Sequence, residues 1–363
     1  MATKQNQYLP ETVSHPGETL LERLEELGIG SKEFAIRTSK PEKTISKIIS
    51  GQSAITPDMA VLFEDVLQIP ANFWLTRQKQ FDEAVARIKR ASTIATSINW
   101  AKAFPYAKMA SFGWVPSTRK IDEKVSYLFK YFGIATQQAF EDYYFNEKLK
   151  VSFRMSLAHT KMPYAFASWV RQGEIQSQSI NAPNYDSKKL TDSLPQIKSL
   201  MANHPVDFFS QLQQICLQAG VKLVYTPCLP GAQLHGCTRW LKDTPLIQMS
   251  ARYKQNDIFW FTFFHELAHI LLHGKKHISL ETVGYDTEQE VKEKEADDFA
   301  ISWTFTEAQE KEVLAAAPLM PMQIEEFAKK FETHPAMIIG RFHHKGLIPF
   351  SMGREFIEKV EIE

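Results

Sequence analysis

The stretch Asp257–Gly274, DIFWFTFFHELAHILLHG, decides how the second half of this chain is organised. It contains His265-Glu266-Leu267-Ala268-His269 inside a run dense in Phe, Leu and Ile. On an α-helix of about 100° per residue, His269 lies only ~40° round from His265, and Glu266 falls on the same side. Two imidazoles one turn apart can bind one Zn²⁺, and the adjacent carboxylate can take a proton from water. We therefore predict a buried metal helix, with His265 and His269 as ligands and Glu266 as general base. The alternative is a histidine pair that binds no metal.

A hydrolytic zinc site needs a third protein ligand and one open position. The position where an HExxHxxGxxH pattern would place another His is Lys275, which excludes the metzincin arrangement. The next helical pattern is Glu288–Thr304, EQEVKEKEADDFAISWT, with an apolar stripe at helical spacing. We predict Glu295 as third ligand and Asp298 (or Asp297) as the carboxylate that orients a ligand imidazole. The other glutamates of the run are expected on a solvated face.

His273, two turns past His265 on roughly the same face, is expected to support the site as a buried hydrogen-bonded residue or to line the cleft.

HELAHILLH followed about twenty-five residues later by EKEADDFA resembles the ImmA/IrrE family of zinc metallopeptidases. In that family the Glu before Ala-Asp supplies the third ligand. The resemblance thus implies His265, His269 and Glu295 as zinc ligands, Glu266 as general base, and a peptidase activity.

A change of period after Gly220 predicts three short strands ahead of the metal helix, at 221–225, 234–241 and 246–249. Such a sheet suits a zincin-like α+β domain, in which an edge strand can hold an extended peptide. The oxyanion of peptide hydrolysis needs a donor besides the metal. The candidates are His235, Arg252, Tyr253 and His277. We choose His235, because its neighbour Gly236 permits close approach.

The first ninety residues predict five short helices, of which the second and third have helix-turn-helix proportions. Residues 31–50 carry five basic and two acidic side chains, although the first ninety residues hold twelve of each. Apolar Ile residues would hold the third helix, 42–49, against the domain and leave polar groups for phosphates and base edges. The expected DNA-facing residues are Lys32, Lys43, Thr44, Ser46 and Lys47. A small helical bundle with a solvated face is the alternative.

The segments HPGETLLERLEELG, SKPEKTISKIISGQSAITPDMAVLFEDVL and FWLTRQKQFD resemble the Cro/CI-type (XRE) helix-turn-helix domain of HigA-type antitoxins. That resemblance spans about seventy residues and implies binding to double-stranded operator DNA. Glu42, at the start of the reading helix, departs from what a phosphate-facing position favours.

The remaining chain is predicted to be helical. We expect three parts: a helix-turn-helix domain at 1–91, a helical connector or scaffold at 92–217, and a metallopeptidase domain at 218–363 that ends in a helical unit at 321–348. The fold class is therefore mainly α with one α+β domain. The unit at 321–348 also resembles the C-terminal part of the ImmA/IrrE family.

Net charge is zero and charged residues make up 23%, so DNA binding must be local. The three cysteines lack CxxC spacing, and no apolar run is long enough for a signal core or a membrane span, which favours a cytoplasmic protein without a membrane partner.

Two functions fit these patterns. One is a DNA-binding regulator that is also a zinc endopeptidase, with one Zn²⁺ per chain and a repressor-like or antitoxin-like protein as its substrate. The other is a non-enzymatic regulator or antitoxin whose metal is structural or senses a ligand. A homodimer would match the paired half-sites common for such DNA readers.

Overall fold

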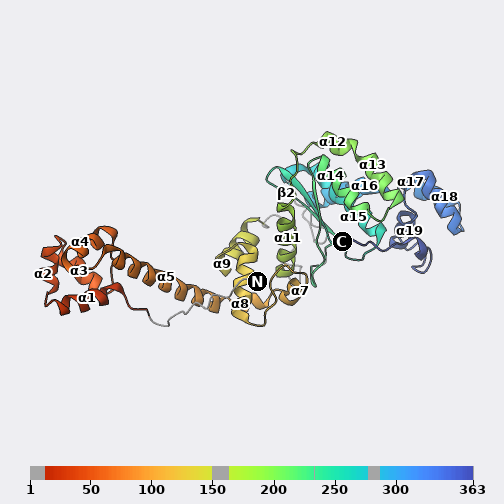
Figure 1. Ribbon diagram of the computed structural model, residues 1–363. Helices are drawn as coiled ribbons and strands as arrows, with labels where there is room; N and C mark the ends of the chain where they lie inside the picture. The colour runs from red at the N-terminus through yellow and green to blue at the C-terminus, as the bar shows by residue number, and fades with distance from the viewer. Residues whose placement is uncertain (1–12, 149–162, 233, 277–286, 363) are drawn as a thin grey trace. The chain divides into compact units, whose positions relative to one another are not determined.

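The computed structural model describes residues 13–148, 163–232, 234–276 and 287–362, and its elements are labelled in Figure 1. In these residues the fold is mainly helical with one three-stranded sheet, as predicted. The chain divides into two compact units, Met1–Ser97 and Ile98–Glu363. The expected domain boundary between a scaffold at 92–217 and a metallopeptidase domain at 218–363 stays a prediction.

Over its described residues, 13–97, the first unit contains five helices: α1 (Pro16–Glu26), α2 (Ser31–Arg37), α3 (Glu42–Ile49), α4 (Pro57–Leu67) and α5 (Ala71–Thr96). Its core is built from Leu, Ile and Phe residues that recur at helical spacing and surround the fully buried Trp74. The fifth helix, expected to be short, runs for 26 residues, because neither proline nor glycine interrupts 71–96.

The second unit begins with helices that lead to the sheet. Their bounds are α6 (Ile98–Lys102), α7 (Tyr106–Ser111), α8 (Ile121–Phe132), α9 (Gln137–Phe140), the π-helical η1 (Glu141–Lys148), α11 (Pro163–Gln178), α12 (Ser187–Asp192), α13 (Leu194–Asn203) and α14 (Phe208–Gln218). A single helix was expected over 190–201. Two helices form instead, because Pro195 occupies the first turn of α13, where its missing N–H costs nothing.

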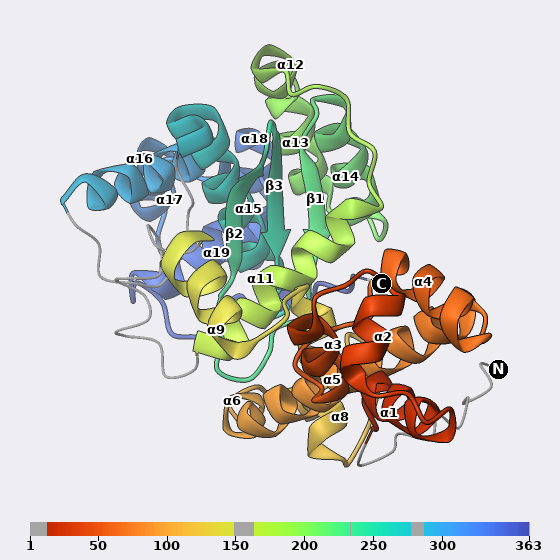
Figure 2. The ribbon, with the colours of Figure 1, turned by 90° about the vertical axis from the view of Figure 1, so that its left-hand side faces the viewer.

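The sheet has the strand order β1-β3-β2, with β1 (Lys222–Tyr225), β2 (Gly236–Leu241) and β3 (Thr244–Met249). Strand β3 pairs parallel with β1 and antiparallel with β2. Side chains alternate between the two faces. On one face, Gln248 donates to the carbonyl of Trp169 in α11. On the other, Thr238 donates to the carbonyl of Glu266 in α15 (Asn256–Ala268). The two helices therefore cover opposite faces of the sheet, as Figure 2 lets the reader follow.

Helix α15 continues as a wider π-helical turn, η2 (His269–His273), and ends at η3 (Gly274–Lys276). The chain then forms α16 (Thr287–Thr304), α17 (Glu307–Ala315), α18 (Pro321–Phe331), α19 (Pro335–His344) and η4 (Arg354–Phe356).

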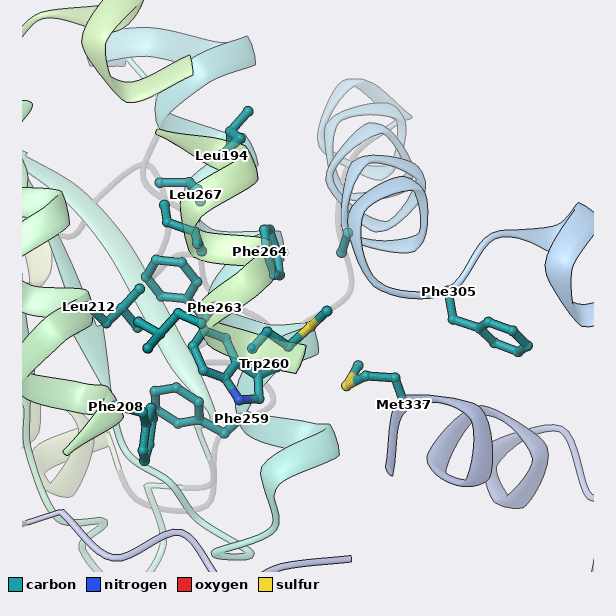
Figure 3. Packing of buried hydrophobic residues seen from close by; sticks show 14 of the residues in the cluster. Leu194, Phe208, Leu212, Phe259, Trp260, Phe263, Phe264, Leu267, Phe305 and Met337 are labelled. Carbon is teal, nitrogen blue, oxygen red and sulfur yellow. The ribbon is translucent and has the colours of Figure 1, made fainter. Parts of the chain in front are cut away.

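Helix α15 lies at the centre of the largest core. Its Phe259, Trp260, Phe263, Phe264 and Leu267 are 0–2% exposed, and Figure 3 shows them beside Phe208 and Leu212 of α14. Because apolar residues cover nearly all of α15, the helix is rigidly held, and the few polar side chains on it have fixed positions. Within the described residues, no helix is both long and apolar enough to cross a bilayer.

Candidate metal centre

The two histidines of α15 and η2 converge. His265 and His269 are 3% and 1% exposed, and their Nε2 atoms lie 3.0 Å apart. Residues four apart stand one above the other on a helix, and burial fixes their rotamers. The predicted pairing of these two imidazoles is thus realised in the structure.

A third potential ligand comes from α16, and it is Glu293. Its Oε2 lies 3.2 Å from His265 Nε2 and its Oε1 lies 3.6 Å from His269 Nε2. One ligand atom from each of these three residues lies within 4.8 Å of the other two. Glu293 is only 15% exposed, although the sequence analysis expected it on a solvated face.

This placement corrects the expectation for Glu295. The Glu295 side chain is 54% exposed, and its Oε2 contacts His273 Nε2 at 3.0 Å rather than joining His265 and His269. Two residues along a helix correspond to about 200° of rotation, so Glu293 and Glu295 cannot face the same point. The fully buried Ala296 and Ala300 fix which side of α16 faces the core.

Of the two carboxylates expected to orient a ligand imidazole, Asp298 or Asp297, the one that contacts a histidine is Asp297. Asp297 Oδ1 lies 2.9 Å from His265 Nδ1, whereas the Asp298 side chain is exposed to solvent. Glu293 and Asp297 are four residues apart and therefore share one stripe of α16. An E-x-x-x-D spacing in the sequence, EKEAD, is the signal that could have identified both.

His273 extends the cluster. Its Nδ1 lies 2.9 Å from His269 Nδ1, and its Nε2 faces Glu295. His273 thus lies between Glu295 and the His269 ring, and its role in supporting the site stays a prediction. A hydrogen-bonded partner on the second ring nitrogen is the usual device for orienting a metal-binding imidazole.

Glu266 is completely buried next to this cluster. Gly236 at the start of β2 makes room for it: a Cβ at this position would lie 2.8 Å from Glu266 Cγ and 2.9 Å from Oε1. Thr238 donates to the Glu266 carbonyl at 3.0 Å. Strand β2 therefore packs against Glu266, the predicted general base. A glycine is required at position 236, because any larger residue would collide with the Glu266 side chain.

His235 lies just before β2 and lines the cavity described below. Its ring is 5.2 Å from that of Tyr253, and burial, followed by the charge of Arg252, lowers its pKa. Its role as oxyanion donor stays a prediction. Another candidate, His277, lies outside the described residues.

The donor set fits a catalytic zinc ion. Two imidazole nitrogens and one carboxylate oxygen are the combination found where zinc keeps an open position for water. Among the described His, Cys, Asp and Glu side chains, the ligand atoms of His265, His269 and Glu293 lie close enough together to hold a metal ion.

In the first unit, the polar face of α3 is available to solvent. Ile45 and Ile48 are fully buried, while Lys43, Ser46 and Lys47 are exposed, Thr44 is half-buried, and Lys32 is exposed on α2. Ser46 donates its hydroxyl to the carbonyl of Glu42. These positions agree with the expected division of α3 into a buried and a polar face.

Two parts of the chain match known proteins. The IrrE N-terminal-like domain (Peptidase_M78) matches residues 216–338. An HTH-type transcriptional regulator of Escherichia coli (strain K12), YddM, is 31% identical over 85 residues, which are 22% of this chain and 90% of YddM. This chain belongs to the HTH-type transcriptional regulators. Its second half carries an IrrE N-terminal-like domain, as the sequence resemblance predicted.

Two solved structures are similar over the N-terminal part of this regulator. A HigA-family addiction module antidote protein from Coxiella burnetii is 28% identical and covers 23% of this chain and 91% of its own, with a TM-score of 0.22. PA4674 from Pseudomonas aeruginosa, solved in complex with its operator DNA, is 29% identical and covers 21% of this chain and 84% of its own, with a TM-score of 0.21.

Proposed function

We propose that this protein is a DNA-binding transcription regulator and a zinc-dependent endopeptidase that cleaves a protein partner of the repressor or antitoxin type. The observation that carries the proposal is the meeting of His265, His269 and Glu293 beside the buried carboxylate of Glu266. A structural zinc site would be closed by four protein ligands, whereas the part of the chain that the structure describes offers three ligands here and a base.

His265, His269 and Glu293 would hold one Zn²⁺, with Asp297 and His273 fixing the outer nitrogens of the two imidazoles. When bound, the ion would act as a Lewis acid on the peptide carbonyl and lower the pKa of water to about 7.

Glu266 would take the proton from the attacking water and deliver it to the leaving amine. Its complete burial between α15 and β2 keeps the carboxylate in one position during both transfers. His235 would donate a hydrogen bond to the oxyanion. The lowered pKa of His235 keeps its imidazole neutral at pH 7, so that one ring nitrogen still carries a proton to donate.

The substrate would be bound as an extended chain. Strand β2 pairs with β3 on one side, and its first residue, Gly236, approaches Glu266 so closely that a Cβ would lie 2.8 Å from Glu266 Cγ. A polypeptide that adds to the other side of β2 by backbone hydrogen bonds would pass close to the general base.

The N-terminal unit would bind operator DNA. Lys32, Lys43 and Lys47 supply phosphate contacts, and Thr44 and Ser46 lie on the same polar side of the helix-turn-helix. A homodimer that reads two half-sites is part of the proposal.

The test of the peptidase compares wild-type protein with Glu266→Gln and, as a control, Glu325→Gln on the exposed side of α18. Each would be produced in the same cells, and new protein N-termini would be identified by terminal-amine labelling. We expect Glu266→Gln to keep its zinc and to lose the new termini, and Glu325→Gln to behave as wild type. New termini at the wild-type level with Glu266→Gln would remove Glu266 as the base. Their absence with the zinc-loaded wild type would favour the non-enzymatic regulator.

A further inference from the structure

A cavity of about 480 Å³ lies beside the metal centre, between α15, α16 and α19. It follows the helix face that carries the ligands. Ile258 and Thr262 of α15 line it, and they precede His265 by seven and three residues, which places both within about 60° of that histidine. On α16, Asp297 contacts His265, and Ile301, one turn further, lines the same space. The volume is in the range of ligand pockets, about 300–1,000 Å³.

Most of the wall is apolar. Ile258, Phe261, Ile301, Phe305 and Met337 come from four different segments of the chain and enclose the middle of the cavity. An occupant must therefore present hydrocarbon over most of its length.

The basic residues of the wall are already engaged. Arg341 donates from Nε to Glu310 and from Nη1 to the carbonyl of Phe305, and Lys345 donates to both carboxylate oxygens of Glu310. These contacts hold the pKa of Glu310 below its usual value, so the ion pairs persist at neutral pH. An anionic ligand would have to compete with Glu310 for these cations.

Asp257 is different, because one oxygen of its carboxylate has no hydrogen-bond donor in the part of the chain that the structure describes. Asp257 lines the cavity at the start of α15, and its Oδ1 is buried without a partner among the described residues. The carboxylate occupies the space left by Gly340 of α19, where a Cβ would lie 2.2 Å from Oδ2. Burial raises the pKa of Asp257, although backbone amides of the first turn and His343 oppose that shift. A buried acceptor without a donor is costly unless a ligand supplies one.

We propose that the cavity receives a side chain with an apolar stem and a cationic end, a lysine or arginine beside the scissile bond, and that Asp257 is the group that pairs with its charge. This specificity rests on the proposed peptidase function. Asp257 lies eight residues before His265, about 12 Å along the helix axis, so only a long side chain can connect the metal centre with this carboxylate. The four-carbon stem of lysine and the arginine side chain match the apolar walls.

Binding can be measured without any cleavage. The zinc-loaded full chain would be titrated with n-pentylamine, and with n-pentanol as the uncharged probe, by ligand-observed NMR. We expect pentylamine to bind at least about tenfold more tightly than pentanol, and Asp257→Asn to remove that difference. Asp243→Asn, an exposed carboxylate on the β2–β3 turn, is the control and should change neither affinity.

Ile301→Phe tests the cavity independently of Asp257. The larger side chain fills the apolar part of the cavity, so the affinity for both probes should fall. Equal affinities of the two probes, or an amine preference that survives Asp257→Asn in a folded variant, would overturn the proposal.

The sites of cleavage distinguish the two sources of the cation. If cleavage products show lysine or arginine next to the cut, and Asp257→Asn loses that preference, the cation is a substrate side chain. If pentylamine binds through Asp257 but no zinc-dependent cleavage occurs, the peptidase function fails and the cavity is a site for a free alkylamine. Cleavage without any preference for lysine or arginine next to the cut contradicts the proposed subsite but agrees with the proposed peptidase function.

Discussion

The third ligand gives the sharpest prediction, because the sequence pattern and the structure assign it to different glutamates. We expect Glu293→Ala to lower the affinity for Zn²⁺ by more than about 100-fold, which corresponds to ~2.7 kcal/mol. The reason is geometric: both Glu293 oxygens face the imidazoles, at 3.2 and 3.6 Å. Loss of a residue that only supports a ligand costs about 10–100-fold. Loss of a direct ligand should exceed that range.

Glu295→Ala is the matched control two residues away. Its carboxylate is 54% exposed and contacts His273 rather than either predicted ligand, so we expect a loss of less than about threefold. Asp297→Asn should fall between the two, at about 10–100-fold, because Asp297 orients His265 through Nδ1.

The assay is competition for zinc against a chromophoric chelator at pH 7.5, with circular dichroism to show that each variant is folded. If Glu295→Ala lost zinc while Glu293→Ala retained it, the assignment drawn from the position of α16 would be refuted.

Three further results are expected. Gly236→Ala should reduce cleavage by about 100-fold while zinc content is unchanged, because the new Cβ lies 2.8 Å from Glu266 Cγ and must displace the base. The control is Gly30→Ala, because a Cβ at position 30 meets nothing within 4 Å. Unaltered cleavage by Gly236→Ala would contradict the close packing of Gly236 against Glu266. The second unit should lose stability as the pH falls from about 6.5 to 4, since burial lowers the pKa of both His204 and His334 to about 4 and the unfolded chain therefore takes up protons first. His334 contributes about 2–3 kcal/mol to this loss of unfolding free energy. Chemical denaturation across that pH range would measure it. An equally steep pH dependence of stability in His334→Gln would contradict the contribution of His334. Lys43→Ala and Lys47→Ala should each weaken binding to operator DNA and reduce the slope of log affinity against log salt by about 1, whereas Lys79→Ala on α5 should change neither. A slope that both α3 variants leave intact would place the DNA contacts elsewhere.

The sequence predicted the metal helix well because its signal is local. His265, Glu266 and His269 lie within five residues, and helical geometry alone puts them on one side. The helices of the first unit were equally readable, since proline and glycine mark their ends and the apolar spacing shows their buried faces.

The third ligand was less readable because it depends on the rotation of α16 about its own axis. Residues 288–298 are rich in acidic residues, and the family resemblance favoured Glu295, whereas only the E-x-x-x-D spacing distinguishes Glu293 and Asp297. The packing of Ala296 and Ala300 against the core fixes that rotation, and it turns Glu293 and Asp297 toward the histidines.

The cavity could not be read from the chain at all. Asp257, Ile301 and Gly340 are more than eighty residues apart at their extremes and become neighbours only when α15, α16 and α19 pack together. The missing side chain of Gly340, which leaves room for the Asp257 carboxylate, has no sequence signature of its own.

The central claim is that two imidazoles and one carboxylate bind zinc and leave a position open. X-ray absorption at the zinc edge, on protein purified with one zinc per chain, tests it most directly. We predict a shell of two imidazole nitrogens and light oxygen ligands at about 2.0–2.2 Å, with one oxygen exchangeable for added acetohydroxamate, and the loss of one imidazole in His269→Ala. A shell that contains sulfur, or one that is closed by four protein ligands and unchanged by the hydroxamate, would contradict the claim.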